Sequence, residues 1–192
     1  MNKKVLIILL GISMFACNFL FQQADTSTPE VSTVIPEISV TEVVDTLSPE
    51  VVTSEVLIKR DNFVVVRLHP ESGDLQSMLA LESQQANSLG LMPIVEFDAT
   101  WCPPCIAIDK AINAENELML NAYRGTYIIK LDVDEWGWND SKIENFEVEA
   151  IPVYFKLDDN GEQTGEVIDG GAWGEDIPEN IAPVMDSFFH SN

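Results

Sequence analysis

The motif Trp-Cys-Pro-Pro-Cys at positions 101–105 constrains this chain more than any other stretch. It follows residues 93–97, which are typical of a buried strand, and precedes residues 106–122, which are rich in helix-forming residue types. Two thiols three residues apart at such a junction can close a disulfide within one helical turn and open it again. A cysteine at a helix N-terminus feels the positive end of the helix dipole, which favours the thiolate, the species that attacks disulfides. The motif therefore predicts thiol–disulfide chemistry.

Two other uses of the cysteine pair are weaker alternatives. A zinc site needs further ligands, but the third cysteine, Cys17, lies in the N-terminal apolar segment and the two histidines lack ligand spacing. A purely structural disulfide is the second alternative. The specificity of the motif favours redox chemistry over both. We expect no metal and no dissociable cofactor, because the pair Cys102–Cys105 itself carries the electrons.

The composition limits the classes of partner. The chain has 192 residues, 46% of them hydrophobic, which is enough for one domain with its own core and additional segments. Its formal net charge is -22. Such an acidic chain is not expected to bind nucleic acid, or an anionic lipid surface by charge.

The N-terminus is typical of a targeting segment. Two lysines precede a short apolar stretch, 5–21, and we assign 1–21 to this segment. Three interpretations stay open. Residues 14–17 resemble the lipobox of bacterial lipoproteins, with lipidation of Cys17, although Met14 stands where leucine is usual. The segment could instead remain as an uncleaved membrane anchor, or be a cleaved secretory signal. All three place the domain outside the cytoplasm, the first two tethered to a membrane, and a mature domain with only two thiols tolerates an oxidising compartment.

Residues 22–58 are predicted to be a disordered linker. They are dominated by Thr, Ser, Val, Glu and Pro and contain no aromatic residue, so they lack the apolar surface that offsets ordering entropy. The folded domain is then 59–192.

The rest of the chain predicts strands and helices in the order β-α-β-α-β-α-β-β-α, with a parallel half followed by a hairpin half. A turn is expected at Asp158–Gly161, because Asn-Gly favours a hairpin. The expected strands are 62–68, 93–97, 126–133, 152–157 and 164–168, and the expected helices are 75–88, 106–122, 141–146 and one from about 176, with a loop at 134–140.

Four segments, in this order and at these spacings, resemble the thioredoxin superfamily: Val95–Cys105, Lys130–Asp134, Ala150–Val153 and Asn160–Glu162. The resemblance implies an α/β fold with a mixed sheet, a parallel βαβ half plus an antiparallel hairpin, flanked by helices. The Trp-Cys-Pro-Pro-Cys form is similar to membrane-tethered, extracytoplasmic thioredoxin-like proteins. Lys110 stands where many family members carry a helix-kinking proline, so a straighter helix is expected.

The chemistry divides between the two cysteines. Cys102 is expected to be the nucleophile, exposed at the helix start, and Cys105 the resolving thiol. Pro103 suits the first helical position, whereas Pro104 removes a backbone donor that could have stabilised the Cys102 sulfur. Only the amide of Cys105 and the helix dipole then remain, so the thiolate should be modestly stabilised. This favours a reductase or isomerase over a strong oxidase.

Glu96 and Lys130 are the expected proton-transfer residues. Glu96 lies in an apolar strand covered on both faces, where an ionised carboxylate is expensive. The resemblance implies that it is the family's buried acid, taking the proton of Cys105, and that Lys130 is its partner lysine. A solvent-facing Glu96 and a surface-exposed Lys130 are the respective alternatives.

The remaining site residues are expected at one edge of the sheet, where open α/β sheets bind ligands. The resemblance implies a cis Ile151–Pro152 bond that pairs with client backbone. Gly170 and Gly171 would let a chain approach closely. Four tryptophans are predicted to gather there, and Trp136 and Trp138 would either widen an apolar platform for a partner or simply pack a loop. The four are Trp101, Trp136, Trp138 and Trp173.

Two functional interpretations follow. The first is an extracytoplasmic thiol–disulfide oxidoreductase that acts on protein thiols and disulfides and exchanges electrons with a redox partner protein. The second is a thioredoxin-fold binding or chaperone module whose thiols are incidental. A strong disulfide oxidase is a variant of the first.

Overall fold

The computed structural model describes residues 54–138 and 140–191. The predicted targeting segment with Cys17, and residues 22–53 of the predicted linker, lie outside this range. Within the range, no helix combines the length and apolarity needed to span a bilayer.

A six-stranded mixed sheet forms the centre of the described part, in the spatial order β1-β2-β4-β3-β5-β6. Strands β2, β4 and β3 run parallel, and β1, β5 and β6 are antiparallel to their neighbours. This confirms the predicted parallel half followed by a hairpin half. The strands are β1 (Glu55–Lys59), β2 (Val64–Arg67), β3 (Met92–Asp98), β4 (Thr126–Asp132), β5 (Val153–Leu157) and β6 (Gln163–Asp169).

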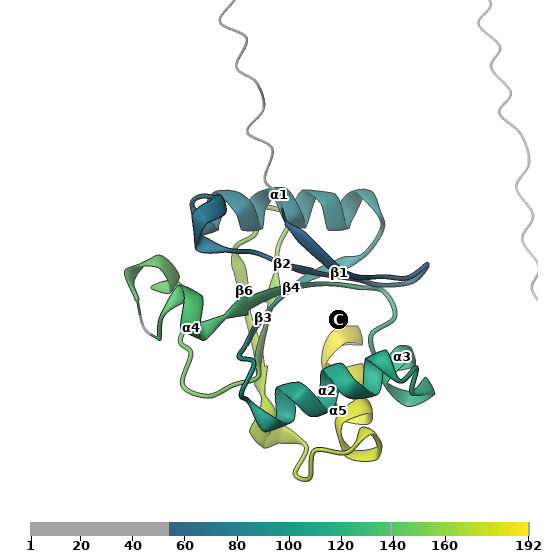
Figure 1. The fold of residues 1–192 in the computed structure, drawn as a ribbon. Coiled ribbons are helices and arrows are strands. Elements are labelled where there is room, and N and C mark those ends of the chain that lie inside the picture. Colours follow the sequence, from purple (N-terminus) through teal and green to yellow (C-terminus); the bar gives the residue numbers. More distant parts are fainter. Residues whose placement is uncertain (1–53, 139, 192) are drawn as a thin grey trace, which may run out of the picture. The chain divides into compact units, whose positions relative to one another are not determined.

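Helices cover both faces of the sheet (Figure 1). One face carries α1 (Leu75–Ser88), and the other carries α2 (Pro103–Asn113), α3 (Glu117–Ala122) and α5 (Pro178–His190). The one-turn helix α4 (Val133–Trp136) follows β4 directly. Three 3-10 turns complete the described part of the chain, η1 (Pro70–Ser72), η2 (Ser141–Ile143) and η3 (Gly170–Ala172).

The central strands divide their side chains between two cores, because alternate residues of a strand point to opposite faces. On β3, Val95 and Phe97 pack in the core under α1, and Ile94 packs in the core under α2, α3 and α5. Glu96 has the parity of Ile94, so the strand geometry directs its carboxyl towards the α2 face. Both cores are mostly apolar, which is why β3 is a hydrophobic run with only two acids, Glu96 and Asp98.

The structure corrects the predicted start of the domain. The composition predicts that residues 54–58 belong to the linker, but Glu55–Lys59 form strand β1, which pairs with β2 at the edge of the sheet. Its residues are mostly exposed, so the strand buries little and its hydrophobic content alone does not identify it. The pairing with β2 supplies the hydrogen bonds that make it a strand.

The predicted helix over 106–122 is two helices. Helix α2 ends at Asn113, Glu115 adopts a left-handed φ of 57°, and α3 begins after Asn116. The side chain of Asn116 accepts hydrogen bonds from the amides of Leu118 and Met119, which is the N-cap interaction that starts a new helix.

The segment between β4 and β5 differs in the same way from the prediction. The expected loop at 134–140 begins with helix α4, and the expected helix at 141–146 is only the 3-10 turn η2. Asp132 caps α4 by accepting a hydrogen bond from the amide of Asp134 at 2.8 Å. This interaction is local, but the sequence identifies it only when the end of β4 is known.

Candidate active site

Cys102 and Cys105 form a disulfide at the N-terminus of α2, with their Cα atoms 5.3 Å apart. Cys102 occupies the N-cap, and its sulfur accepts a hydrogen bond from the amide of Cys105 at 3.3 Å. Pro103 and Pro104 between them have no amide hydrogen to offer. The amide of Cys105 is thus the local backbone donor to this sulfur, as the sequence predicts.

The expected exposure of Cys102 is wrong for this oxidised form. Cys102 is only 2% exposed, as is Cys105, and both belong to the core that lies under α1. The bond to Cys105, whose side chain points into the core from the first turn of α2, draws the Cys102 sulfur inward. In this oxidised form the disulfide therefore presents little surface to a client.

The segment Ile151–Pro152 has a cis peptide bond, as expected, and Ile151 packs against the core that contains both cysteines. The amide of Gly170 donates to the carbonyl of Pro152 at 2.9 Å. A Cβ on Gly170 would lie 3.2 Å from Cδ of Pro152. The close approach predicted for this glycine therefore occurs, and the chain that approaches is the Ile151–Pro152 segment. Gly171 instead donates to Oδ1 of Asp169 in the same turn, at 2.8 Å.

The four tryptophans do not form one platform. Trp101 is 56% exposed beside the disulfide, and Trp138 is exposed in the loop after α4. Trp136 is 1% exposed and donates to the carbonyl of Leu68 at 3.1 Å. Trp173 is buried in the core under α2, α3 and α5. The docking role predicted for Trp136 is wrong, because its indole serves as core between α4 and the end of β2.

Glu96 is buried, with 1% of its surface exposed, and Lys130 beside it is equally buried. The solvent-facing alternative for Glu96 and the surface alternative for Lys130 are both wrong. Burial raises the pKa of Glu96 to about 8, against the opposing attraction of Lys130, and the negative charges of Asp98 and Asp109 raise it further. This carboxyl can hold or release a proton near neutral pH.

Charged residues that the sequence interpretation did not single out surround this pair. Asp98 accepts two hydrogen bonds from Arg67, at 3.1 and 2.9 Å, and lies 2.9 Å from the ammonium of Lys130. Asp109 on α2 accepts from the same ammonium at 2.7 Å. The sequence does contain a signal for two of these neighbours. Asp98 follows Glu96 by two residues, and Asp132 follows Lys130 by two, so each aspartate lies on the same face of the sheet as the residue before it in the pair.

A hollow of about 250 Å³ reaches these residues. Glu96, Lys130 and Asp109 line it on one side, with Leu57 and Ile58 of β1 among its other lining residues. Strand β1, missed from the sequence, therefore forms part of the wall beside the buried acid.

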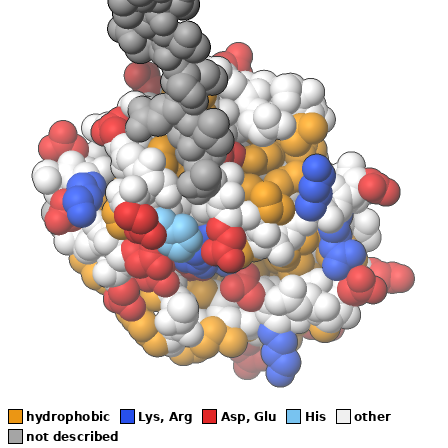
Figure 2. All heavy atoms as spheres, turned by 45° about the horizontal axis from the view of Figure 1, so that its top comes forward, with side chains coloured by type: hydrophobic (Ala, Val, Ile, Leu, Met, Phe, Trp, Pro, Cys, Tyr) orange, Lys and Arg blue, Asp and Glu red, His pale blue; other side chains and the backbone are white. Residues whose placement is uncertain are grey.

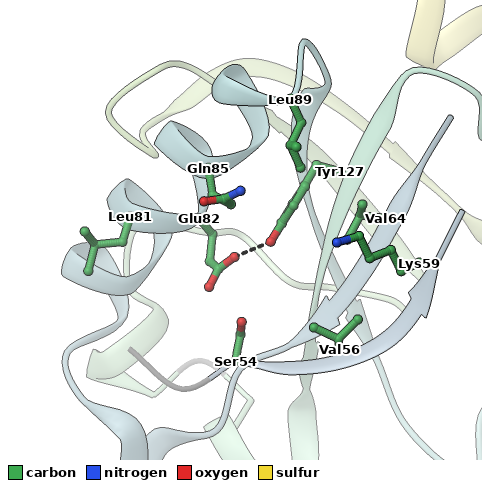
Figure 3. A pocket seen from close by; sticks show the side chains of 9 residues that line it. All are labelled: Ser54, Val56, Lys59, Val64, Leu81, Glu82, Gln85, Leu89 and Tyr127. Atoms are coloured by element: carbon green, nitrogen blue, oxygen red, sulfur yellow. Dashed lines mark hydrogen bonds between the residues drawn. The ribbon is translucent and has the colours of Figure 1, made fainter. Parts of the chain in front are cut away.

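A larger hollow, of about 420 Å³, lies between α1 and β1 (Figure 3). Exposed hydrophobic side chains from both elements gather on this face of the molecule (Figure 2), among them Val56, Leu81 and Leu89. At its floor the hydroxyl of Tyr127 donates to the buried carboxylate of Glu82 at 2.5 Å. Neither cysteine lines it.

Among residues 54–138 and 140–191, no group of three or more His, Cys, Asp and Glu side chains is arranged to hold a metal ion.

The chain is similar to known proteins. The family model described as Thioredoxin matches residues 83–182. A thioredoxin of Staphylococcus haemolyticus is 39% identical over 94 residues, which cover 48% of this chain and 78% of that protein. Thioredoxin H4 of Arabidopsis thaliana is 30% identical over 103 residues, 53% of this chain and 77% of the relative. The structure of Trichomonas vaginalis thioredoxin, 24% identical, aligns over 65% of this chain and 96% of its own with a TM-score of 0.43.

Proposed function

The chain belongs to the thioredoxin family, and from that premise we propose that it reduces or isomerises disulfides of client proteins outside the cytoplasm, tethered to a membrane. Thiol–disulfide exchange is the activity of the family. The observation that carries the proposal is the Cys102–Cys105 disulfide at the start of α2, next to the strand that holds the buried Glu96.

The reductase cycle begins with the reduced pair. The thiolate of Cys102 attacks one sulfur of a client disulfide, so that the client S–S bond breaks, a Cys102–client bond forms, and the released client sulfur takes up a proton. The thiolate of Cys105 then attacks the Cys102 sulfur, which restores the Cys102–Cys105 bond and releases the second client thiol. Two electrons pass to the client, and a dithiol of a redox partner protein must return them.

Glu96 handles the proton of Cys105 in this cycle. Cys105 must lose its proton before it attacks, and the carboxylate of Glu96 accepts it. With a pKa of about 8, the carboxyl is roughly one tenth ionised at neutral pH, and the fraction able to accept a proton rises steeply with pH. Lys130 supplies the positive charge that makes this ionised form accessible.

Client binding is assigned to the groups around the disulfide edge. The backbone of Ile151–Pro152 pairs with an extended client segment, and Gly170 leaves room behind it. The exposed indole of Trp101 covers the client on the other side, and Trp138 is an outer contact. Gly171 shapes the turn at Gly170–Ala172 through its hydrogen bond to Asp169.

Turnover in an insulin-reduction assay tests this function. The full chain should reduce insulin, Cys102→Ser should abolish the activity, and Cys105→Ser should accumulate a mixed disulfide with the client. If the wild-type chain and Cys102→Ser bind the client equally well and neither reduces insulin, the result would instead support a binding or chaperone module.

The weak stabilisation of the Cys102 sulfur supports the proposed reducing direction of electron flow. The Cys102 sulfur has one backbone donor, at 3.3 Å, so the reduced form gains little stability from it. We therefore expect a redox potential closer to the value of about -270 mV for thioredoxin than to the value of about -120 mV for the strong periplasmic oxidant DsbA. Equilibration with glutathione buffers measures it. A potential at the oxidising end would assign the chain to disulfide formation.

The location rests on residues 1–21. We favour lipidation of Cys17, with an uncleaved anchor and a cleaved secretory signal as the alternatives. Mass spectrometry of the N-terminus distinguishes them, because lipidation adds acyl mass to a chain that starts at Cys17. Cys17→Ser should then lose the acyl mass and keep residues 1–16, whereas an anchored chain would carry residues 1–16 already in the wild type.

A further inference from the structure

A layer of charged side chains crosses the sheet beneath α2. The strand register places Arg67 on β2, Lys130 on β4, Glu96 on β3 and Tyr154 on β5 in one row. Asp132 and Asp98 pair in the next row, on the same face. The layer lies in a core that is otherwise apolar, so each member depends on its neighbours for compensation.

The ammonium of Lys130 is shared unequally within this layer. It lies 2.7 Å from Asp109, 2.9 Å from Asp98 and 3.5 Å from Oε1 of Glu96. That Oε1 atom is buried and has no hydrogen-bond partner among the residues that the structure describes. The cation nearest to the buried acid is therefore bonded to two other carboxylates.

Asp109, on α2, contacts this layer from the solvent side. Its side chain is 47% exposed, whereas those of Glu96 and Lys130 are 2% exposed, and all three line the same hollow. Asp98 is fixed differently, because Arg67 binds both of its oxygens. Neutralising Asp98 would deprive a half-buried guanidinium of its partner, but neutralising Asp109 would leave Lys130 with Asp98 and Glu96.

We propose that Asp109 is a positioning residue that holds the Lys130 ammonium at the α2 side of the hollow, away from Glu96, and thereby sets when Glu96 can accept the proton of Cys105. The catalytic consequence rests on the proposed function, whereas the geometric part stands without it. Asp109 keeps the acid from forming a close ion pair, and this preserves a carboxyl that still binds protons near neutral pH.

Electrostatics around Glu96 support this direction. Burial raises its pKa, Lys130 lowers it, and Asp98 and Asp109 raise it. The other groups that face it are the hydroxyl of Tyr154 from β5, the guanidinium of Arg67 from β2 and the phenol of Tyr123 after α3. Removal of the Asp109 charge acts twice in the same sense, because it removes a repulsion and frees Lys130 to approach Glu96.

The test is an NMR titration of the Glu96 carboxyl carbon in the oxidised full chain, assigned as the resonance that Glu96→Gln removes. In Asp109→Asn the midpoint should fall by roughly 0.5 to 1 pH unit. Asp109→Glu, which keeps the charge, should retain the wild-type midpoint. Glu117→Gln, which removes one exposed negative charge from α3, is the matched control and should also leave the midpoint unchanged.

An unchanged or higher midpoint in Asp109→Asn would overturn the inference, as would an equal shift in Glu117→Gln or a shift of the same size in Asp109→Glu. The kinetic arm is separate. If Glu96→Gln leaves the pH profile of turnover unchanged, the proton-transfer role under the proposed function fails, while the titration still decides whether Asp109 positions Lys130.

Discussion

The indole nitrogen of Trp101 donates a hydrogen bond to Oδ2 of Asp134 at 2.7 Å. The bond joins the residue before Cys102 to α4, which follows the central strand β4. Trp101 is largely exposed, yet one edge of its ring is tied to a carboxylate. The large apolar face beside the disulfide is thus held in one orientation at an otherwise open surface.

Breaking this bond should weaken client binding more than chemistry. In Asp134→Ala the acceptor is lost and the indole can rotate, so KM for insulin should rise roughly threefold to tenfold with kcat little changed. Stability should change by no more than about 1 kcal/mol, because the bond is exposed. Glu135→Gln removes the neighbouring charge without touching Trp101 and is the control. Equal KM values for both variants would contradict the role of this bond.

Gly170→Ala should impair turnover through the Ile151–Pro152 segment. The added Cβ would lie 3.2 Å from Cδ of Pro152, closer than ordinary contact, so the segment must shift by a few tenths of an ångström. We expect kcat/KM to fall roughly threefold to tenfold and stability to fall by about 1 kcal/mol. Gly171→Ala is the comparison, because its Cβ would meet a side-chain oxygen, Oδ1 of Asp169, at 3.0 Å and not the Ile151–Pro152 segment. Wild-type kcat/KM in Gly170→Ala would show that the segment tolerates the shift.

The buried acid should make stability depend on pH. The folded-state pKa of Glu96 is about 8, above its ordinary value of 4.5, so between these values the folded chain binds more protons than the unfolded chain. The free energy of unfolding therefore falls as pH rises through this window. The stabilising contribution is complete below the lower value and lost above the upper one.

Glu96→Gln removes that dependence, since the amide does not titrate. Relative to wild type, the variant should be more stable at about pH 9 than at about pH 5, by a difference on the order of 3 to 5 kcal/mol. Urea unfolding at both pH values measures the difference. A constant offset between the two proteins would show that Glu96 titrates normally in the folded chain.

Gly161 is expected to be intolerant of any side chain. It has a left-handed φ of 76°, and a Cβ would lie 2.5 Å from the backbone nitrogen of Ala80 on α1. Because a helix backbone cannot give way, Gly161→Ala should cost about 3 kcal/mol or more. In Gly165→Ala the added Cβ has nothing within 4 Å, so only the left-handed backbone strain remains. This variant should lose about 1 kcal/mol of stability. Thermal unfolding ranks the two, and equal losses would contradict the contact with α1.

Local patterns were sufficient for the elements whose partners lie nearby in the sequence. The hydrophobic run of β3, the motif at the start of α2 and the Asp158–Gly161 turn each follow from adjacent residues, and each occurs as predicted. The side chain of Asp158 closes that turn by accepting from the amides of Asn160 and Glu162.

Long-range partners explain the misses. Strand β1 exists because β2 offers a free edge, and its own exposed residues resemble the preceding linker. Trp136 is core because the carbonyl of Leu68, distant in sequence, accepts its indole hydrogen. In the sequence, Asp109 is indistinguishable from other polar residues of the helix, because its contact with Lys130 forms only in the folded chain.

By itself, the sequence determined the chemistry and the order of elements, because a dithiol at a strand-to-helix junction and the periodicity of its flanks are local properties. Only the tertiary structure decided the environment of that chemistry: how deeply Cys102 is buried, which tryptophans meet solvent, and how three carboxylates share one ammonium. The reason is physical, since burial and electrostatic coupling depend on distances between residues that the chain brings together only when the sheet has closed.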